Sequence, residues 1–162
     1  MRDDRTGEHM DLILWRHAEA CDADQVEHDL SRPLTPRGEK HAARMAQWLD
    51  RQLPEGVRIL CSPALRAEQT VQALQRKYKV RDALAPGACV QDVLETSGWP
   101  HARCPVLVVG HQPALGAVVS QLFGMGSAPI AIRKGGVWWL RARQREGVAQ
   151  TMILSVMSPE RL

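Results

Sequence analysis

The sequence predicts an α/β protein, folded as a single three-layer α/β/α domain around a mostly parallel central sheet. Short apolar runs alternate along the chain with segments whose apolar residues recur at helical spacing. The run Val106–Val109 is apolar throughout, as expected of a strand that is covered on both faces. The 162 residues are enough for one domain with a real core and too few for two ordinary domains. We therefore assign residues 10–162 to this domain and the polar residues 1–9 to a flexible N-terminal extension.

The amino-terminal half begins with a strand and continues into a helix. The apolar run Asp11–Trp15 predicts the first strand, and a polar loop follows it to about Leu34. Thr35 is a suitable N-cap and Pro36 suits the first helical position, so a helix is expected to begin there. Its apolar residues recur at i, i+3, i+4 and i+7 and form one stripe facing the sheet: Ala42, Met45, Ala46 and Leu49.

A second strand is expected over Arg58–Cys61, again followed by a helix. Ser62-Pro63 repeats the pattern of a capping residue and a proline, which predicts that Ser62 caps this second helix. Arg66 falls in its first turn, where backbone N–H groups and the helix dipole favour an anion. The predicted buried stripe of this helix consists of Ala67, Val71, Leu74 and Tyr78.

The rest of the chain alternates in the same way. The patterns predict, in order, a strand over Val80–Leu84, a short helix near Val90–Thr96, the central strand Val106–Val109, a helix over Pro113–Phe123, a loop over Gly124–Pro129, and closing strands over Val137–Ala142 and Met152–Met157. Strands that alternate with helices favour parallel pairing, because each helix returns the chain to the end of the sheet at which the previous strand began.

Composition excludes several classes of protein. The formal net charge is only +3, and no dense Lys/Arg run alternates with aromatic residues, so we expect no nucleic-acid partner. No apolar stretch reaches the roughly 18–20 residues that span a bilayer, and the amino terminus lacks the apolar segment of a secretory signal. We expect a cytoplasmic protein without a membrane partner. The scattered cysteines are expected to be reduced thiols: Cys21, Cys61, Cys89 and Cys104.

Two arginines and two histidines follow predicted strands. Arg16 and His17 end the first strand, Arg66 follows the second, and His111 ends the central one. In a parallel sheet these residues would meet at the carboxyl edge, where α/β proteins bind ligands. Two permanent positive charges and two imidazoles suit a phosphoryl group, with one imidazole as the covalent nucleophile. The pattern predicts a phosphatase that needs no metal or other cofactor, in which the arginines lower the imidazole pKa by repulsion.

Four segments, in this order along the chain, resemble a known family: Arg16–Glu19, Arg32–Gly38, Ser62–Thr70 and Gly110–Pro113. Together they resemble the histidine phosphatase superfamily. The short chain and the Arg-Pro-Leu-Thr segment are most similar to its small SixA-type branch of phosphohistidine phosphatases. The resemblance extends from about residue 11 to 140, and four motifs in order are far more specific than any one.

The resemblance implies a role for each of the four residues. His17 would be the phosphorylated nucleophile, and Arg16 and Arg66 would bind the phosphoryl oxygens. His111 would complete the pocket by donating to those oxygens as charge builds. The superfamily triplet is Arg-His-Gly, whereas this chain has Ala18 in the third place, which adds one methyl group near the phosphate. The remaining histidines lie away from strand ends and are expected to be solvated or structural: His9, His28, His41 and His101.

Relatives that cleave phosphate esters usually carry a carboxylate after the third strand as a general acid, whereas this chain reads Leu84-Ala85-Pro86-Gly87-Ala88. An alkoxide leaving group needs that proton, but a phosphohistidine imidazole can be protonated before it departs. The missing acid therefore favours cleavage of a P–N bond. Glu19 is the carboxylate that we expect near the substrate. Other carboxylates could supply a proton if loops bring them close: Asp22, Asp24 and Asp92.

The predicted function is hydrolysis of phosphohistidine on a partner protein, such as a phosphotransfer domain or phosphocarrier, through phosphorylated His17. The connections between strands are too short for a full lid, so the pocket could admit a residue on a protein surface. Lys134 is expected to be an ordinary solvated loop residue. Two alternatives stay open: a phosphomonoesterase for a small metabolite, and a non-catalytic domain that binds phosphate or a phosphoprotein.

Overall fold

The computed structural model describes residues 9–162 and contains one six-stranded sheet, ordered β3-β2-β4-β1-β5-β6. Strands β1 to β4 are mutually parallel where they pair, and β5 and β6 extend the sheet as an antiparallel hairpin. The predicted mostly parallel sheet is confirmed. The strands are β1 His9–Arg16, β2 Arg58–Cys61, β3 Lys79–Val80, β4 Val106–Gly110, β5 Val137–Arg145 and β6 Val148–Met157.

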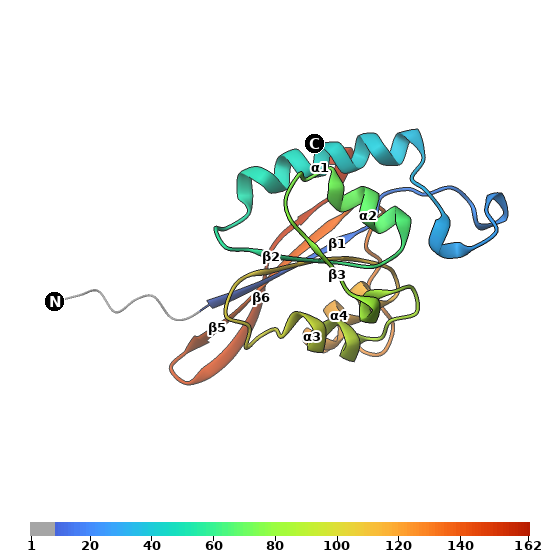
Figure 1. Ribbon diagram of the computed structural model, residues 1–162. Coiled ribbons are helices and arrows are strands. Elements are labelled where there is room, and N and C mark those ends of the chain that lie inside the picture. The colour runs from blue at the N-terminus through green and yellow to red at the C-terminus, as the bar shows by residue number, and fades with distance from the viewer. Residues whose placement is uncertain (1–8) are drawn as a thin grey trace.

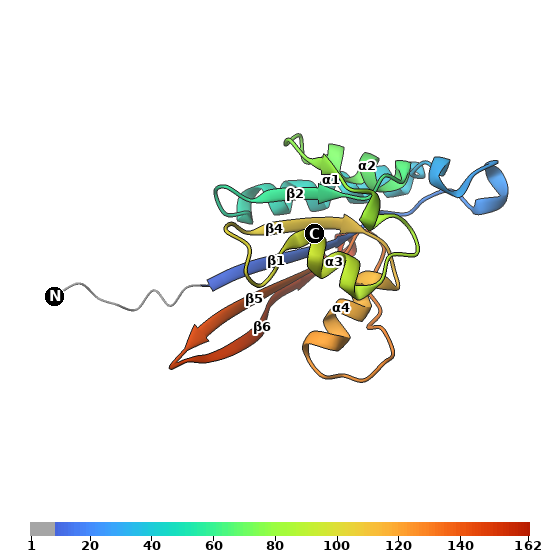
Figure 2. The same cartoon turned by 60° about the horizontal axis from the view of Figure 1, so that its bottom comes forward.

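Helices cover the two faces of the sheet, which gives the predicted three layers. Helices α1 and α2 lie on one face and α3 and α4 on the other, as Figures 1 and 2 show from two directions. The α-helices are α1 Pro36–Gln52, α2 Leu65–Gln72, α3 Val90–Ser97 and α4 Ala114–Leu122. Short 3₁₀ turns lie at η1 Ala23–Gln25, η2 Asp29–Ser31, η3 Asp82–Leu84 and η4 Pro159–Arg161.

The core is divided by the sheet, because successive side chains of a strand point to opposite faces. In β1, Ile13 and Trp15 pack with α1 and α2, whereas Leu12 and Leu14 pack with α3 and α4. All four side chains are fully buried. Strand β1 lies between β4 and β5, so both of its faces and both of its edges are covered, and its carboxyl end is firmly placed.

Several element boundaries differ from the sequence predictions. His9 belongs to β1 rather than to the extension, whose other residues, 1–8, lie outside the described residues. The strand predicted over Val80–Leu84 is short and gives way to the η3 turn. Helix α2 begins at Leu65, two residues later than a Ser62-Pro63 cap requires, with Ala64 as N-cap. The closing strands are longer than predicted, because pairing between β5 and β6 continues to the hairpin turn.

Helix α1 docks tightly on the segment that follows β1. As predicted, Thr35 is the N-cap, and its hydroxyl accepts a hydrogen bond from the Gly38 N–H at 3.0 Å. The backbone N–H of Thr35 donates to the Glu19 carbonyl. A Cβ atom at Gly38 would lie 2.0 Å from that same carbonyl oxygen. Only a glycine allows this approach, so Gly38 fixes how close the helix lies to the carboxyl end of β1.

Two further observations concern the described part of the chain. No helix within residues 9–162 combines the length and apolar character that crossing a membrane would require. Each of the four cysteines is a free thiol in this structure, and only Cys61 is buried.

Candidate active site

The four residues that the sequence singled out meet in one pocket at the carboxyl edge of the sheet. Strands β1 and β4 pair with Arg16 opposite Gly110, which places His17 and His111 side by side, with ring centroids 5.1 Å apart. The chain leaves β1 toward the α1 face and leaves β4 toward the α4 face. The pocket therefore lies where connections diverge, the usual ligand site of an α/β sheet.

This pocket has a volume of about 220 Å³, and charged side chains dominate its lining. The residues that line it come from the end of β1, the first turn of α2 and four loops: Arg16, His17, Ala20, Asp22, Arg32, Arg66, Pro86, His111, Gln112 and Lys134. Four of these carry a fixed positive charge and one carries a negative charge, which gives a cationic site suited to an anion.

His17 is oriented by its own backbone neighbourhood. Its backbone N–H donates to the Gly110 carbonyl at 3.1 Å, and its Nδ1 lies 2.7 Å from the Ala18 carbonyl oxygen. A carbonyl can only accept, so Nδ1 carries the proton and Nε2 keeps its lone pair. Burial lowers the His17 pKa to about 3, and the nearby His111, Arg66 and Arg16 add to this shift. The ring is neutral at pH 7 and can act as a nucleophile through Nε2.

The pKa shift has two causes that act in the same direction. Desolvation is the larger cause for both rings, and repulsion from the arginines also lowers the pKa of both, as the sequence predicted. Burial lowers the pKa of His111 to about 4, with Arg66 adding to the shift. Each ring is less than a tenth exposed, since it lies beneath the loops that close the end of the sheet.

Arg16 and Arg66 are both held by protein oxygens on one side of the guanidinium. Arg16 Nη1 donates to the Ile132 carbonyl at 2.7 Å. Arg66 donates from Nη1 to the Asp29 carbonyl at 2.8 Å and from Nη2 to the Asp29 carboxylate at 3.0 Å. The Nε atoms of both arginines are buried and have no hydrogen-bond partner among the described residues.

His111 has the same feature as the two arginines. Its Nδ1 is buried without a partner among residues 9–162, while its Nε2 lies 2.6 Å from the Ser62 hydroxyl. Unpaired buried polar atoms are costly, so native proteins contain few of them. Among the described residues four side chains contain such an atom, and three of them line this pocket: Arg16, Arg66 and His111.

Three further site residues were missed or assigned otherwise at the sequence level. Arg32 lines the pocket and donates to the Asp29 carboxylate at 3.0 Å, so Asp29 links Arg32 to Arg66. Burial alone would raise the pKa of Asp29, but the hydrogen bond and charge of Arg66, with those of Arg32, lower it overall. Lys134, expected to be an ordinary solvated residue, lines the pocket. Only the Arg-Pro-Leu-Thr motif gave a signal for Arg32.

Known proteins resemble this chain in sequence and in structure. Residues 12–87 match the histidine phosphatase superfamily (branch 1). The phosphohistidine phosphatase SixA of Escherichia coli is 35% identical over 124 residues, which cover 70% of this chain and 74% of the relative. The chain belongs to the histidine phosphatase superfamily. It falls in the SixA-type branch, as the motifs predicted.

Solved structures of this branch have the same architecture. The structure of SixA complexed with tungstate has a TM-score of 0.73 and 29% identity, and the match covers 94% of this chain and 99% of that one. A putative SixA from Agrobacterium tumefaciens has a TM-score of 0.74 and 25% identity, covering 92% and 97% of the two chains. This chain thus has the fold of these SixA structures over nearly all of their length.

The superfamily signature varies at Ala18, and the structure accommodates it. Ala18 is fully buried, and its backbone N–H donates to the Thr70 hydroxyl at 3.0 Å. Thr70 in turn donates to the Arg66 carbonyl, so the segment after β1 is tied to helix α2. The Ala18 methyl group packs with Leu34 and Ala42, so it is buried between the segment after β1 and the start of helix α1.

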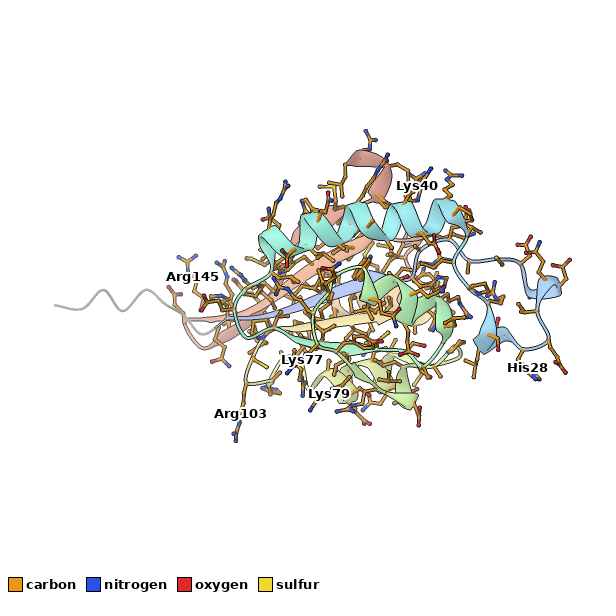
Figure 3. All side chains as sticks on the ribbon, turned by 45° about the horizontal axis from the view of Figure 1, so that its top comes forward. His28, Lys40, Lys77, Lys79, Arg103 and Arg145 are labelled. Carbon is orange, nitrogen blue, oxygen red and sulfur yellow. The ribbon has the colours of Figure 1, made fainter. Side chains whose placement is uncertain are left out.

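The structure shows which of the candidate carboxylates lie at the pocket. Glu19, which we expected near the substrate, does not line the pocket: its carboxylate accepts from the Thr35 hydroxyl at 2.8 Å and faces Arg37. Asp92 accepts from the Cys89 N–H at the start of α3. Only Asp22 lines the pocket, at the loop between β1 and α1. This loop, blue in Figure 1, projects beyond the carboxyl end of β1, with His28 near its tip in Figure 3.

The segment after β3 contributes Pro86 to the pocket wall and no carboxylate. No group of three or more His, Cys, Asp or Glu side chains within residues 9–162 is arranged to hold a metal ion. Among the described residues, the pocket offers a nucleophile, N–H donors and positive charge for a phosphoryl group.

Proposed function

We propose that this histidine phosphatase hydrolyses phosphohistidine on a partner protein through a phosphorylated His17. One observation carries the proposal: Arg16, Arg66 and His111 line the same pocket as His17, and each has a buried nitrogen atom without a hydrogen-bond partner among the described residues. A phosphoryl group has three non-bridging oxygens that can accept from these donors. N–H donors fixed before the reaction stabilise the charge that develops on those oxygens.

The reaction has two steps. The substrate imidazole takes up a proton from solvent, His17 Nε2 attacks the phosphorus, an N–P bond to His17 forms, and the P–N bond to the substrate imidazole breaks. Water then attacks phosphorylated His17 and loses a proton to solvent, which releases inorganic phosphate and returns Nε2 with its lone pair. The arginines hold the phosphoryl oxygens throughout both steps, and their guanidinium groups stay charged at any working pH.

The choice of phosphohistidine follows from the pocket wall. Pro86 stands in the segment where ester-cleaving relatives carry their general acid, and it cannot donate a proton. An imidazole leaving group depends less on such a donor than an alkoxide does. Two relatives of this chain are named as a phosphohistidine phosphatase or its homologue, from Escherichia coli and Haemophilus influenzae.

The choice of a protein substrate follows from the loops around the pocket. The connections after β2 and β4 are only residues 62–64 and 111–113, too short to fold over the site, and the longer connections, 17–35 and 123–136, contribute Asp22 and Lys134 to its wall. Asp22 and Lys134 lie at the mouth and are exposed. A phosphotransfer domain or phosphocarrier could therefore present its phosphohistidine from its own surface. The four free cysteines suit the cytoplasm, where we place this activity.

The test compares phosphate release from a phosphohistidine-bearing protein and from p-nitrophenyl phosphate, in EDTA. We expect fast release from the phosphoprotein, slow ester cleavage, and loss of both activities in His17→Ala. Acid-labile ³²P transferred to the wild type but not to His17→Ala identifies the intermediate. Efficient ester cleavage without any phosphohistidine turnover would overturn the proposal, and an absence of both would favour a binding domain.

Asp22 is the observation that favours the second candidate, a phosphomonoesterase for a small metabolite. It is the one carboxylate among the described residues that line the pocket, and it could protonate an alkoxide. Asp22→Asn separates the two functions. For a phosphohistidine phosphatase we expect less than about a threefold loss. For an esterase that relies on this acid, ester cleavage should fall by about 10²-fold or more.

A further inference from the structure

Ser62 makes the hydrogen bond that orients His111 in the pocket. Its hydroxyl oxygen lies 2.6 Å from His111 Nε2, and the serine is completely buried. The two residues directly follow β2 and β4, which are paired neighbours in the sheet. The Ser62 N–H also donates to the Val109 carbonyl at 3.0 Å, so the sheet itself fixes the distance between the two side chains.

The surroundings of the hydroxyl determine which group donates in this hydrogen bond. The Ser62 oxygen already accepts a hydrogen bond from the Ala64 N–H at 3.1 Å. Its single proton has no acceptor other than His111 Nε2 among the residues that the structure describes. A buried hydroxyl that failed to donate would leave a costly unpaired group. The O–H therefore donates to Nε2, and the neutral ring carries its proton on Nδ1.

We propose that Ser62 is a positioning residue that keeps His111 as the Nδ1–H tautomer, so that the ring donates to a bound phosphoryl oxygen. His111 Nδ1 is the buried atom that lacks a partner among residues 9–162. In the opposite tautomer a lone pair would face the phosphoryl oxygen and repel it. The identity of the ligand rests on the proposed function, whereas the tautomer rests on the geometry alone. The sequence left two roles open for Ser62, the cap of helix α2 or a hydroxyl near the phosphate, and Ala64 occupies the cap position.

The chain offers a matched control in Ser97. This serine is also completely buried, and its hydroxyl accepts from the N–H two residues further on, that of Trp99, at 3.3 Å. Its proton goes to the Leu94 carbonyl rather than to an imidazole. Ser62→Ala and Ser97→Ala therefore remove equivalent buried hydroxyls, but only the first removes a hydrogen bond to the pocket. Thermal unfolding reports how much stability each variant loses.

The experiment reads the ¹⁵N chemical shifts of the histidine rings at pH 7, with and without inorganic phosphate. In the wild type and Ser97→Ala we expect the Nδ1–H pattern for His111, and a shift of that N–H proton when phosphate binds. In Ser62→Ala we expect the Nε2–H form to appear. Phosphate affinity and the rate of His17 phosphorylation should each fall about three- to tenfold, the effect of one net hydrogen bond.

Two results would overturn the proposal: an Nε2–H pattern in the wild type, or an unchanged Nδ1–H pattern in Ser62→Ala. If Ser62→Ala does not fold, Ser62→Cys keeps the volume with a weaker donor and should show a mixture of tautomers. Failure of the wild type to hydrolyse phosphohistidine, with the tautomer result intact, would refute the proposed function and leave the role of Ser62 standing for phosphate binding.

Discussion

At the scale of single residues, the site consists of side chains that use only part of their hydrogen-bonding capacity within the protein. Arg66 donates two of its N–H groups to Asp29, Arg16 donates one to Ile132, and His111 is paired through Nε2 alone among the residues that the structure describes. Each of these three side chains also lines the pocket and has a buried nitrogen without a partner among the described residues. Fixing one side of each group against protein oxygens lets the other side face the ligand without further reorganisation, which is what electrostatic catalysis requires.

Removal of the Arg66 side chain should lower kcat/KM by about 10²–10³-fold, by analogy with loss of one oxyanion-hole donor. Steady-state hydrolysis of a phosphohistidine protein by Arg66→Ala measures this effect. Arg76→Ala is the matched control, because Arg76 also pairs with an aspartate, Asp50, but lies away from the pocket. Near-full activity of Arg66→Ala would remove this residue from the assigned site.

The imidazoles of His17 and His111 should remain neutral well below the ordinary histidine range. Burial lowers their pKa values to about 3 and about 4, so neither ring should titrate between pH 7 and pH 5. Two-dimensional NMR of the ¹⁵N-labelled histidines measures this directly, and His17→Ala assigns the signals. Titration of either ring near pH 6.5 in the unliganded protein would contradict the burial seen in the structure.

At the scale of elements, the position of helix α1 depends on one close approach. In most helices an alanine is about 1 kcal/mol more favourable than a glycine. At Gly38 the added Cβ would meet the Glu19 carbonyl oxygen at 2.0 Å. This carbonyl also accepts the N–H of the N-cap, so the backbone on both sides is constrained. The steric cost should therefore exceed the gain in helix propensity.

Gly38→Ala should destabilise the protein by about 2 kcal/mol, because overpacking a buried contact typically costs about 1–3 kcal/mol. Urea unfolding of the variant measures the change. Ala43→Gly, at an exposed position of the same helix, shows the effect of propensity alone and should cost about 1 kcal/mol. A Gly38→Ala variant that is more stable than the wild type would show that the approach of α1 to β1 is looser than described.

At the scale of the whole molecule, the buried site should make folding stability depend on pH. Both pKa values are lowered in the folded state relative to 6.5. Below pH 6.5 the unfolded chain therefore binds protons that the folded protein does not, so stability falls as pH decreases toward these folded-state values. Between pH 7 and pH 5 each ring should contribute a loss of roughly 1–2 kcal/mol, given 1.36 kcal/mol per pKa unit.

The free energy of unfolding by urea at pH 7, 6 and 5 tests this dependence. The double variant His17→Asn/His111→Gln should show a clearly flatter profile over this range, whereas His101→Gln, at an exposed position, should keep the wild-type slope. An equally steep profile in the double variant would mean that other groups dominate the acid sensitivity. Saturating inorganic phosphate should raise stability in the wild type, because a ligand that binds only the folded state stabilises it.

The sequence by itself determined the fold class and the family, and it predicted the four site residues His17, Arg16, Arg66 and His111. Apolar runs and helical spacing are local properties, and the motifs lie at strand ends whose parallel pairing brings them together. The same local patterns misplaced the end of β3 and the start of α2, where packing against the sheet overrides local preference.

Only the tertiary structure decided how the site is completed. In the structure Glu19 lies at the start of α1 rather than in the pocket, and Arg32 and Lys134 line the pocket wall. Ser62 is hydrogen-bonded to His111. These contacts join residues far apart in the sequence, and no local pattern encodes them. The tertiary structure also showed that burial, more than arginine charge, keeps the imidazoles neutral, because desolvation depends on everything that packs around a group.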